Sequence, residues 1–334
     1  MSERDTAITS FIAAAGWGAA ERFPLAGDAS FRRYCRLQQN GVSAMLMDAP
    51  PPQEDVRPYL AVARHLSDLG FSAPAILAAD EAQGLLLIED FGDGTYTRLF
   101  ARGEGEEPLY QLAVDVLIEL HRRFTPPNAP WLPPYDDTRL LNEAALLVDW
   151  YMPAITGESV ADSVREEYLA IWRDLLPVAR AVPSSLVLRD YHVDNLMRIP
   201  GRDGLDACGL LDFQDAVLGP VTYDLVSLLE DSRRDVSPWL AASLTARYLK
   251  AFPDLDHGTF EASYAVMGAQ RHCKVVGIFT RLCRRDGKPV YLKHIPRLWR
   301  LIAEDLQHPA LTPVKTWLDR HIPPALRLVP KENP

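Results

Sequence analysis

The chain has 334 residues, of which 48% are hydrophobic and 24% charged, and its formal net charge is −10. This composition is ordinary for a globular protein, and the length allows a sizeable core in one large domain or two lobes. The negative charge argues against nucleic acid as the main partner, because phosphate backbones are bound by clustered Lys and Arg. The N-terminus lacks the apolar core of a signal peptide, and no apolar run is long enough to span a bilayer. We therefore expect a cytoplasmic protein that does not bind a membrane.

The first 90 residues alternate between strand-like and helix-like patterns. An Asn-Gly pair at Asn40 and Gly41 lies between two apolar runs, which is a strong signal for a hairpin. Three prolines end this hairpin, and the next helix-like stretch stops at Gly70. The predicted elements are a short helix at 6–15, two strands within 31–48, a helix at 54–69, and strands at 74–79 and 84–89.

From residue 95 onward the pattern is mostly helical. Two short apolar segments, at 185–188 and 205–211, interrupt it and read as strands. We therefore predict an α+β fold of two lobes, with a small β-rich N-terminal lobe at 1–90 and a larger helical lobe at 91–334. Helices are predicted at 110–124, 138–152, 161–181, 222–232, 237–251, 258–284 and 295–306.

Both of these short predicted strands are followed by residues whose side-chain oxygens could bind a metal ion or a hydroxyl group. Asp190 and Asn195 come five positions apart after the first strand, and Asp212 directly follows the second. Transfer of a nucleotide's phosphate needs a carboxylate to orient the acceptor hydroxyl and two oxygen ligands for Mg²⁺. Each residue alone could be a turn or capping residue. The combination favours a catalytic site.

This segment resembles the aminoglycoside phosphotransferase family, which has a protein-kinase-like fold. The family pattern H-G-D-x-x-x-x-N is matched by Leu188-Arg189-Asp190 with Asn195, so its His and Gly are replaced here. A later G-x-x-x-x-D-L is matched from Gly219 to Asp224 and Leu225. The resemblance implies ATP and Mg²⁺ as cofactors, Asp190 as the catalytic carboxylate, Asn195 and Asp212 as magnesium ligands, and Asp224 as a structural support of the loop.

The N-terminal lobe follows the family less closely. A loop with small residues precedes the first hairpin, where kinases cover the nucleotide phosphates. The third strand of a kinase carries a phosphate-binding Lys, but Ala44–Asp48 has none, so Arg32 or Arg33 could replace it. No Walker-type P-loop motif is present. The expected nucleotide-binding residues are Asp28, Ala29, Ser30, Phe31, Arg32 and Arg33 at the loop, and Glu89, Asp90 and Phe91 at the hinge between the lobes.

Four segments together, Gly27–Arg33, Met47–Pro52, the predicted catalytic loop and the predicted helix at Arg271–Arg285, resemble a narrower group within the family, the anomeric kinases of cell-wall amino sugars. These enzymes phosphorylate the C1 hydroxyl of N-acetylmuramate and N-acetylglucosamine in peptidoglycan recycling. Independently, residues 265–300 contain nine Lys or Arg and a single acid, Asp286. Most of these cations could form a solvated helix face. Alternatively, Arg271, His272 or Lys274 contacts an anionic acceptor such as the lactyl carboxylate of N-acetylmuramate.

Other readings stay open. His192 and Asp194, inside the catalytic loop, could contact the acceptor sugar or cap the loop, and His121 reads as a packing residue at a helix end. The acceptor could instead be an aminoglycoside, or a small metabolite as in choline and homoserine kinases. The missing Lys also suggests a nonenzymatic pseudokinase, although Asp190, Asn195 and Asp212 argue against it.

Overall fold

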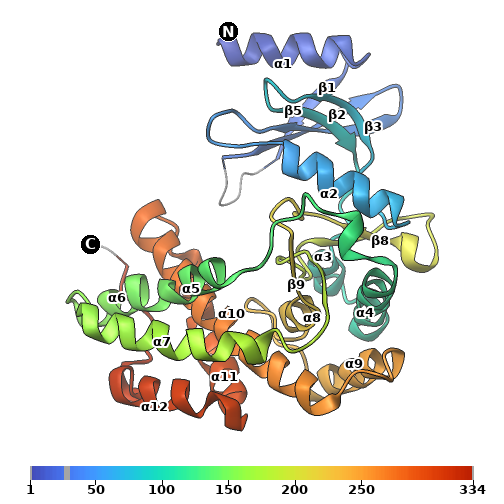
Figure 1. The fold of residues 1–334 in the computed structure, drawn as a ribbon. Helices are drawn as coiled ribbons and strands as arrows, with labels where there is room; N and C mark the ends of the chain where they lie inside the picture. The colour runs from blue at the N-terminus through green and yellow to red at the C-terminus, as the bar shows by residue number, and fades with distance from the viewer. Residues whose placement is uncertain (1, 26–30, 333–334) are drawn as a thin grey trace. The chain divides into compact units, whose positions relative to one another are not determined.

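The computed structural model describes residues 2–25 and 31–332, so the predicted phosphate-loop residues Asp28, Ala29 and Ser30 lie outside the described part. The chain divides into two compact units (Figure 1). The first comprises residues 1–116 and 193–216, and the second comprises 117–192 and 217–334. A lobe boundary near residue 90 stays a prediction. No helix of the described residues combines the length and the apolarity that a membrane span needs.

The first unit is built on a five-stranded antiparallel sheet of order β1-β2-β3-β5-β4. The predicted hairpin joins β2 to β3, and Asn40 and Gly41 both have positive φ (53° and 79°), as a tight hairpin turn requires. β5 lies between two strands, and its residues Leu85–Ile88 are buried, which explains their uninterrupted apolar run. The strands are β1 (Glu21–Pro24), β2 (Arg33–Gln39), β3 (Val42–Asp48), β4 (Ile76–Asp80) and β5 (Leu85–Glu89).

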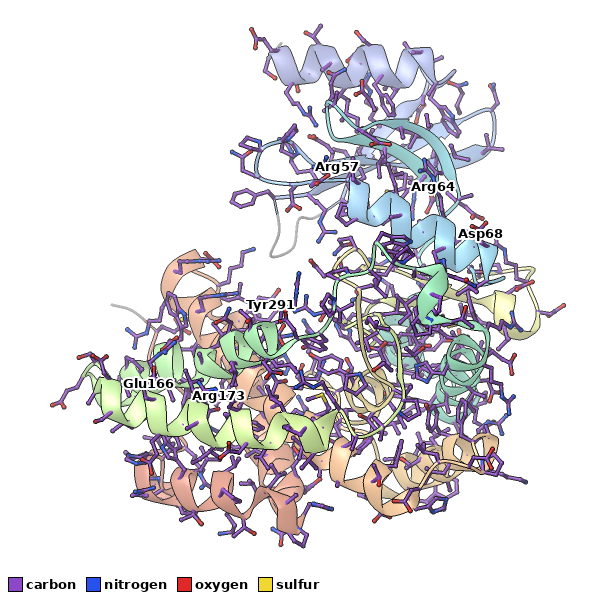
Figure 2. All side chains as sticks on the ribbon, viewed as in Figure 1. Arg57, Arg64, Asp68, Glu166, Arg173 and Tyr291 are labelled. Atoms are coloured by element: carbon purple, nitrogen blue, oxygen red, sulfur yellow. The ribbon has the colours of Figure 1, made fainter. Side chains whose placement is uncertain are left out.

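Two helices lie on opposite sides of this sheet (Figure 1). α1 (Glu3–Ala14) is closed at its start by a capping box between Ser2 and Asp5, and it buries Ile12 against Leu37, Ala44, Leu46 and Leu87 of the sheet. α2 (Arg57–Asp68) is strongly amphipathic and directs Arg57, Arg64 and Asp68 outward (Figure 2). A small hairpin of β7 (Leu196–Arg198) and β8 (Cys208–Leu210) and the short α3 (Tyr96–Ala101) complete the unit.

The second unit is helical and is organised around α10 (His257–Asp286), a 30-residue helix whose central residues are almost all buried. Gly277 lets the backbone of α10 pass close to Leu146, where an added Cβ would collide with the Leu146 carbonyl group. α7 exposes Glu166 and Arg173 on its outer face (Figure 2). The remaining elements are α5 (Asp137–Leu146), α6 (Met152–Thr156), α7 (Asp162–Ala179), β6 (Ser184–Val187), β9 (Val217–Pro220), α8 (Thr222–Leu229), α9 (Pro238–Ala251), α11 (Ile295–Asp305) and α12 (Thr312–His321).

Most predicted elements are found within a few residues of their expected bounds. α4 (Glu106–Arg123) begins four residues before the predicted helix, and the helix predicted at 138–152 is interrupted by a π-helical turn at Leu147–Tyr151. The π-turn directly precedes α6, where Pro153 lacks the N–H that a regular helix would use. β1, β7, β9, α3 and α12 were not predicted, because they are short or lack a clear apolar period.

His121, the predicted packing residue, lies near the end of α4. Its Nδ1 is 2.7 Å from the hydroxyl oxygen of Tyr248 on α9, and burial lowers the pKa of His121 to about 3. The unfolded chain protonates this imidazole near its ordinary pKa, whereas the folded chain does not. Stability is therefore complete at neutral pH and decreases as the pH falls below about 6.5.

We expect His121→Gln to reduce this acid sensitivity. Because the pKa of His121 is lowered to about 3 in the folded protein, the free energy of unfolding of the wild type falls by up to about 2 kcal/mol between pH 7 and pH 5 through this group. The variant has no imidazole at this position and does not lose this contribution. Urea unfolding of both proteins at the two pH values measures the difference. Equal losses of stability in wild type and variant would show that His121 titrates normally in the folded protein.

Candidate active site

The segment that carries Asp190 is held by hydrogen bonds from its backbone to one buried carboxylate. β6 pairs with β9, and the chain then turns at Leu188 and Arg189. Their N–H groups donate to Asp224 Oδ2 and Oδ1 at 2.6 and 2.9 Å. Burial raises the pKa of Asp224 to about 7, although the two N–H donors favour its ionised form. Asp224, in the first turn of α8, thus has the position expected of a residue that supports the loop.

Arg189 occupies the position where the family pattern has Gly, and its backbone explains that preference. Its φ is 71°, in the left-handed region that a side chain adopts at a cost of about 1–2 kcal/mol. The Arg189 guanidinium forms an ion pair with Glu143 of α5 and lies over the ring of Tyr135 at 5.8 Å. Glu143 also binds Lys274 Nζ at 3.0 Å. The side-chain contacts of Arg189 thus offset part of its backbone strain.

Asp190 lies among cationic groups of the second unit. Desolvation acts to raise the pKa of Asp190, but His192, Lys274, Arg271 and Arg189 lower it, and the net result is a pKa below the ordinary value. The side chain is therefore ionised at neutral pH. An ionised carboxylate accepts hydrogen bonds, so it can orient a hydroxyl group.

Asn195 and Asp212 both lie at one end of the β7–β8 hairpin in the first unit. Asn195 directly precedes β7 and Asp212 follows β8, and Leu196 pairs with Leu210. A hydrogen bond of 3.0 Å from the Leu211 N–H to the Asn195 carbonyl extends this pairing toward both residues. An amide oxygen and a carboxylate at the same hairpin end form a donor set that suits Mg²⁺.

Arg32, rather than Arg33, lies next to this hairpin end. Arg32 Nη2 is 3.4 Å from Asp212 Oδ1, and its Nε is 3.7 Å from Glu54. Arg33 is mostly exposed and pairs with Asp48 instead, at 2.7 Å. Of the two arginines considered as substitutes for the missing Lys, Arg32 has the more suitable position. The Phe31 N–H also donates to Glu54, while the Phe31 ring is exposed.

The residues predicted to form the hinge have contacts within the first unit. Glu89, at the end of β5, forms an ion pair with Arg202, and Asp90 binds Arg36 at 2.6 Å. The Phe91 ring packs on Met197 and Ile199. Gly209 makes this possible, because a Cβ there would lie 2.7 Å from the Phe91 ring. The side chains of Glu89, Asp90 and Phe91 thus have structural contacts within the first unit, and adenine binding by this segment stays a prediction.

The residues predicted to contact the acceptor sugar differ in how many of their side-chain atoms already have hydrogen-bond partners. His192 Nε2 is 3.1 Å from Arg233 Nη1, and Asp194 binds the Thr97 hydroxyl. Arg271 donates to the Ser227 hydroxyl at 2.8 Å through Nη2, while its buried Nη1 has no hydrogen-bond partner among the described residues. Glu143, Ser227 and Arg233 were not predicted, because only the folded chain brings them to the loop.

His272 lies in the interior of the second unit, whereas a residue that contacts the acceptor sugar needs an accessible side chain. It is fully buried, its Nδ1 is 2.8 Å from Asp305, and burial lowers the pKa of His272 to about 4. The imidazole is therefore neutral at pH 7 and provides no charge for an anion. Contact of His272 with the acceptor stays a prediction without direct support from this geometry.

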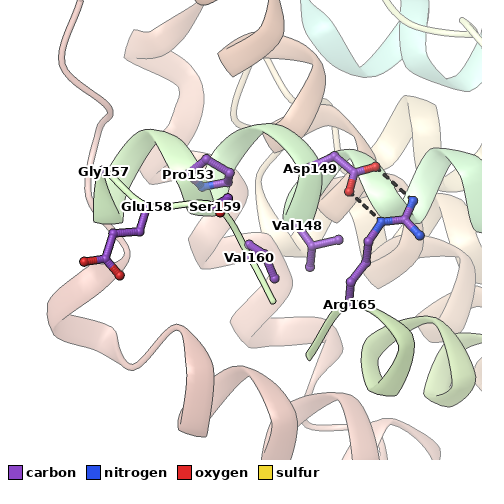
Figure 3. Close-up of a pocket in the computed structure, with 8 residues that line it drawn as sticks. All are labelled: Val148, Asp149, Pro153, Gly157, Glu158, Ser159, Val160 and Arg165. Atoms are coloured by element: carbon purple, nitrogen blue, oxygen red, sulfur yellow. Dashed lines mark hydrogen bonds and ion pairs between the residues drawn. The ribbon is translucent and has the colours of Figure 1, made fainter. Parts of the chain in front are cut away.

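The second unit also contains two pockets away from the predicted residues. One, of about 380 Å³, lies between the end of α6 and the start of α7, where Arg165 pairs with both oxygens of Asp149 (Figure 3). The other, of about 500 Å³, is lined by His121, Ser185 and Tyr248. Neither pocket contains a predicted site residue.

The chain belongs to the phosphotransferase enzyme family, whose sequence model matches residues 23–259. It is therefore an enzyme that transfers a phosphate group. The N-acetylmuramate/N-acetylglucosamine kinase of Caulobacter vibrioides is 39% identical over 355 aligned positions, which cover 96% of this chain and 98% of that protein. The kinase of the same name from Pseudomonas aeruginosa is 39% identical, with 89% and 88% covered.

Solved structures support the fold. The GDP complex of aminoglycoside 2'-phosphotransferase-IIIa superposes with a TM-score of 0.63 at 14% identity, covering 91% of this chain and all of that one. At this identity the likeness concerns the fold alone. It confirms the predicted class, with a β-rich N-terminal part and a mostly helical C-terminal part.

The strain at Arg189 gives a stability prediction. Arg189→Gly and Arg189→Ala both remove the ion pair with Glu143, but only alanine keeps a Cβ at positive φ. We expect the glycine variant to be more stable by about 1 kcal/mol. At exposed Arg173 in α7 the order should reverse, because glycine disfavours a helix. Urea unfolding of the four variants tests this, and an alanine variant as stable as glycine at position 189 would contradict it.

Proposed function

We propose that the protein uses ATP to phosphorylate the C1 hydroxyl of N-acetylmuramate and N-acetylglucosamine, giving sugar 1-phosphates. The observation that carries this proposal is the 39% identity to the Caulobacter kinase, which extends over 96% of the chain. Similarity over the whole length includes the regions that recognise the acceptor as well as the nucleotide. Kinases of the same name from two further species match more than four fifths of the chain.

Asp190 is the proposed catalytic carboxylate. It is ionised at neutral pH, and the Asp224 hydrogen bonds fix the backbone that carries it. It accepts a hydrogen bond from the C1 hydroxyl and orients the oxygen toward the γ-phosphorus of ATP. It takes the proton as the C1 oxygen bonds to this phosphorus and the bond from the phosphorus to the bridging oxygen of the leaving ADP breaks. An anomeric hydroxyl is more acidic than an ordinary alcohol, so orientation matters more here than strong basicity.

Asn195 and Asp212 are the proposed magnesium ligands. Their position at one end of the β7–β8 hairpin provides an amide oxygen and a carboxylate, which fits the hard-oxygen preference of Mg²⁺. Asn195 comes five positions after Asp190, so the Cα atoms of these two residues can be no more than about 18 Å apart. When bound, the ion would neutralise charge on the nucleotide phosphates. Arg32, beside Asp212, adds a positive charge at the same position.

Arg271 is the proposed contact for the carboxylate of N-acetylmuramate. It lies near Asp190, is almost completely buried, and its Nη1 has no hydrogen-bond partner among the described residues. A buried donor without a partner is costly, and a ligand carboxylate would satisfy it. Lys274, the other candidate, is already paired with Glu143 at 3.0 Å.

The proposed reaction is tested by measuring ADP release with both amino sugars, kanamycin and choline. We expect activity with the amino sugars alone, and a phosphorus NMR signal from a C1 phosphate.

Asp190→Asn should lower kcat about 10²–10⁴-fold and leave ATP binding nearly unchanged, because it removes the proton acceptor and keeps the shape of the side chain. Asp174→Asn makes the same chemical change on the exposed face of α7 and should have no effect. Full activity of Asp190→Asn would overturn the catalytic role proposed for Asp190. In the first experiment, a preference for kanamycin or choline would overturn the proposed acceptor.

Recognition of the carboxylate is tested at Arg271. We expect Arg271→Gln to raise KM for N-acetylmuramate about tenfold or more, and KM for N-acetylglucosamine, which has no lactyl carboxylate, by much less. Arg271→Lys, which retains the charge, should be intermediate. Arg285→Gln changes an exposed arginine near the end of the same helix and serves as the matched control. Equal effects of Arg271→Gln on both sugars would reject the assignment.

A further inference from the structure

Three ligand-type side chains from distant parts of the sequence meet inside the second unit. Glu230 follows the last turn of α8, His272 lies in the middle of α10, and Asp305 ends α11. One nitrogen or oxygen atom of each lies within 4.8 Å of the others. His272 and Asp305 are buried, whereas the Glu230 side chain is 19% exposed, so it gives the cluster a route to solvent.

The contacts around His272 favour one nitrogen as a metal ligand. Nδ1 is 2.8 Å from Asp305 Oδ2, which is a hydrogen bond. Nε2 faces Glu230, with its carboxylate Oε2 at 3.6 Å and its backbone oxygen at 3.3 Å. An imidazole whose Nδ1–H is held by a carboxylate while Nε2 binds the ion is the usual arrangement of metal-bound histidine.

One further observation indicates that the cluster can take a ligand. Glu230 Oε2 is a buried atom without a hydrogen-bond partner among the described residues, although Tyr264 and Asp305 bond to the Glu230 side chain. Gly268 lies one turn before His272 and lets Asp305 pack against α10, because a Cβ there would be 2.6 Å from Oδ1 and 3.1 Å from Oδ2.

We propose that Glu230, His272 and Asp305 form a structural site for a first-row divalent cation such as Zn²⁺. His272 Nε2 and the Glu230 carboxylate would bind the ion directly, Asp305 would hold the imidazole from Nδ1, and water molecules would complete the four ligands that Zn²⁺ takes. A nitrogen donor beside carboxylates selects Zn²⁺ over Mg²⁺, which takes oxygen ligands. The ion would compensate two carboxylates that otherwise lie close together in a buried place.

The site would join the ends of α8 and α11 to α10. Glu230 is followed by Asp231, Ser232 and Arg233, and the Arg233 guanidinium contacts His192 of the catalytic loop. The Arg233 N–H also binds Asp231 Oδ1 at 2.8 Å. A cation at Glu230 would therefore stabilise the segment that contacts His192, without taking part in phosphate transfer.

The test uses the full-length protein after dialysis against a chelator, followed by titration with ZnCl₂. We expect one Zn²⁺ per chain by elemental analysis, protons released into weakly buffered solution, and a Tm that rises with zinc concentration. MgCl₂ at the same concentrations should change none of these. Glu230→Gln and His272→Gln should each weaken zinc binding by on the order of 100-fold.

Two exposed residues of α10 give matched controls, since Glu261→Gln and His257→Gln make the same changes outside the cluster and should bind zinc like the wild type. If His272→Gln fails to fold, Glu230→Gln still tests zinc binding, because the Glu230 side chain is partly exposed and its replacement should let the protein fold. Zinc binding absent from the wild type, or unchanged in Glu230→Gln, would overturn the proposal and leave a hydrogen-bonded network without a metal.

Discussion

The segment that carries Asp190 depends on one buried carboxylate, that of Asp224. It accepts the N–H groups of Leu188 and Arg189, and these two hydrogen bonds fix a turn that places Arg189 at positive φ. A turn of this kind is stable only when its surroundings determine it. Removing the carboxylate would leave two buried donors without partners and release the turn. The geometry of Asp190 thus follows from a residue that takes no part in the chemistry.

A group of buried charges also contacts the Arg189 side chain of this turn. Arg189, Glu143 and Lys274 come from the loop, α5 and α10, and they form one connected group in which each cation contacts the same carboxylate. Buried charges are costly unless they are paired and hydrogen-bonded. The basic residues of α10 therefore have two different uses. Arg271 and Lys274, in the central turns, are buried and bind Ser227 and Glu143, whereas Arg285 near the end of the helix is exposed.

The sequence allowed prediction of those features that depend on local pattern. Asn40-Gly41 predicted the hairpin, and the spacing of Asp190, Asn195 and Asp212 predicted a phosphotransferase, which family membership confirms. The roles of the individual site residues stay predictions. The sequence did not indicate that Arg32 rather than Arg33 lies beside Asp212, because the two are neighbours in the chain and only the fold shows that Arg32 directly precedes β2 while Arg33 begins it. Glu230, His272 and Asp305 were also missed as a group, since they are separated by more than 30 residues and only helix packing brings them together.

The division of the chain has a consequence for synthesis on the ribosome. The first unit needs residues 193–216, because Phe91 packs on Met197 and Ile199 and the β7–β8 hairpin belongs to this unit. The first 116 residues therefore emerge long before their unit can be completed. The 76 residues of the second unit at 117–192 must be made in between, and Phe91 remains without its packing partners during that time. At elongation rates of about 5–20 residues per second, this delay lasts roughly 4–15 seconds.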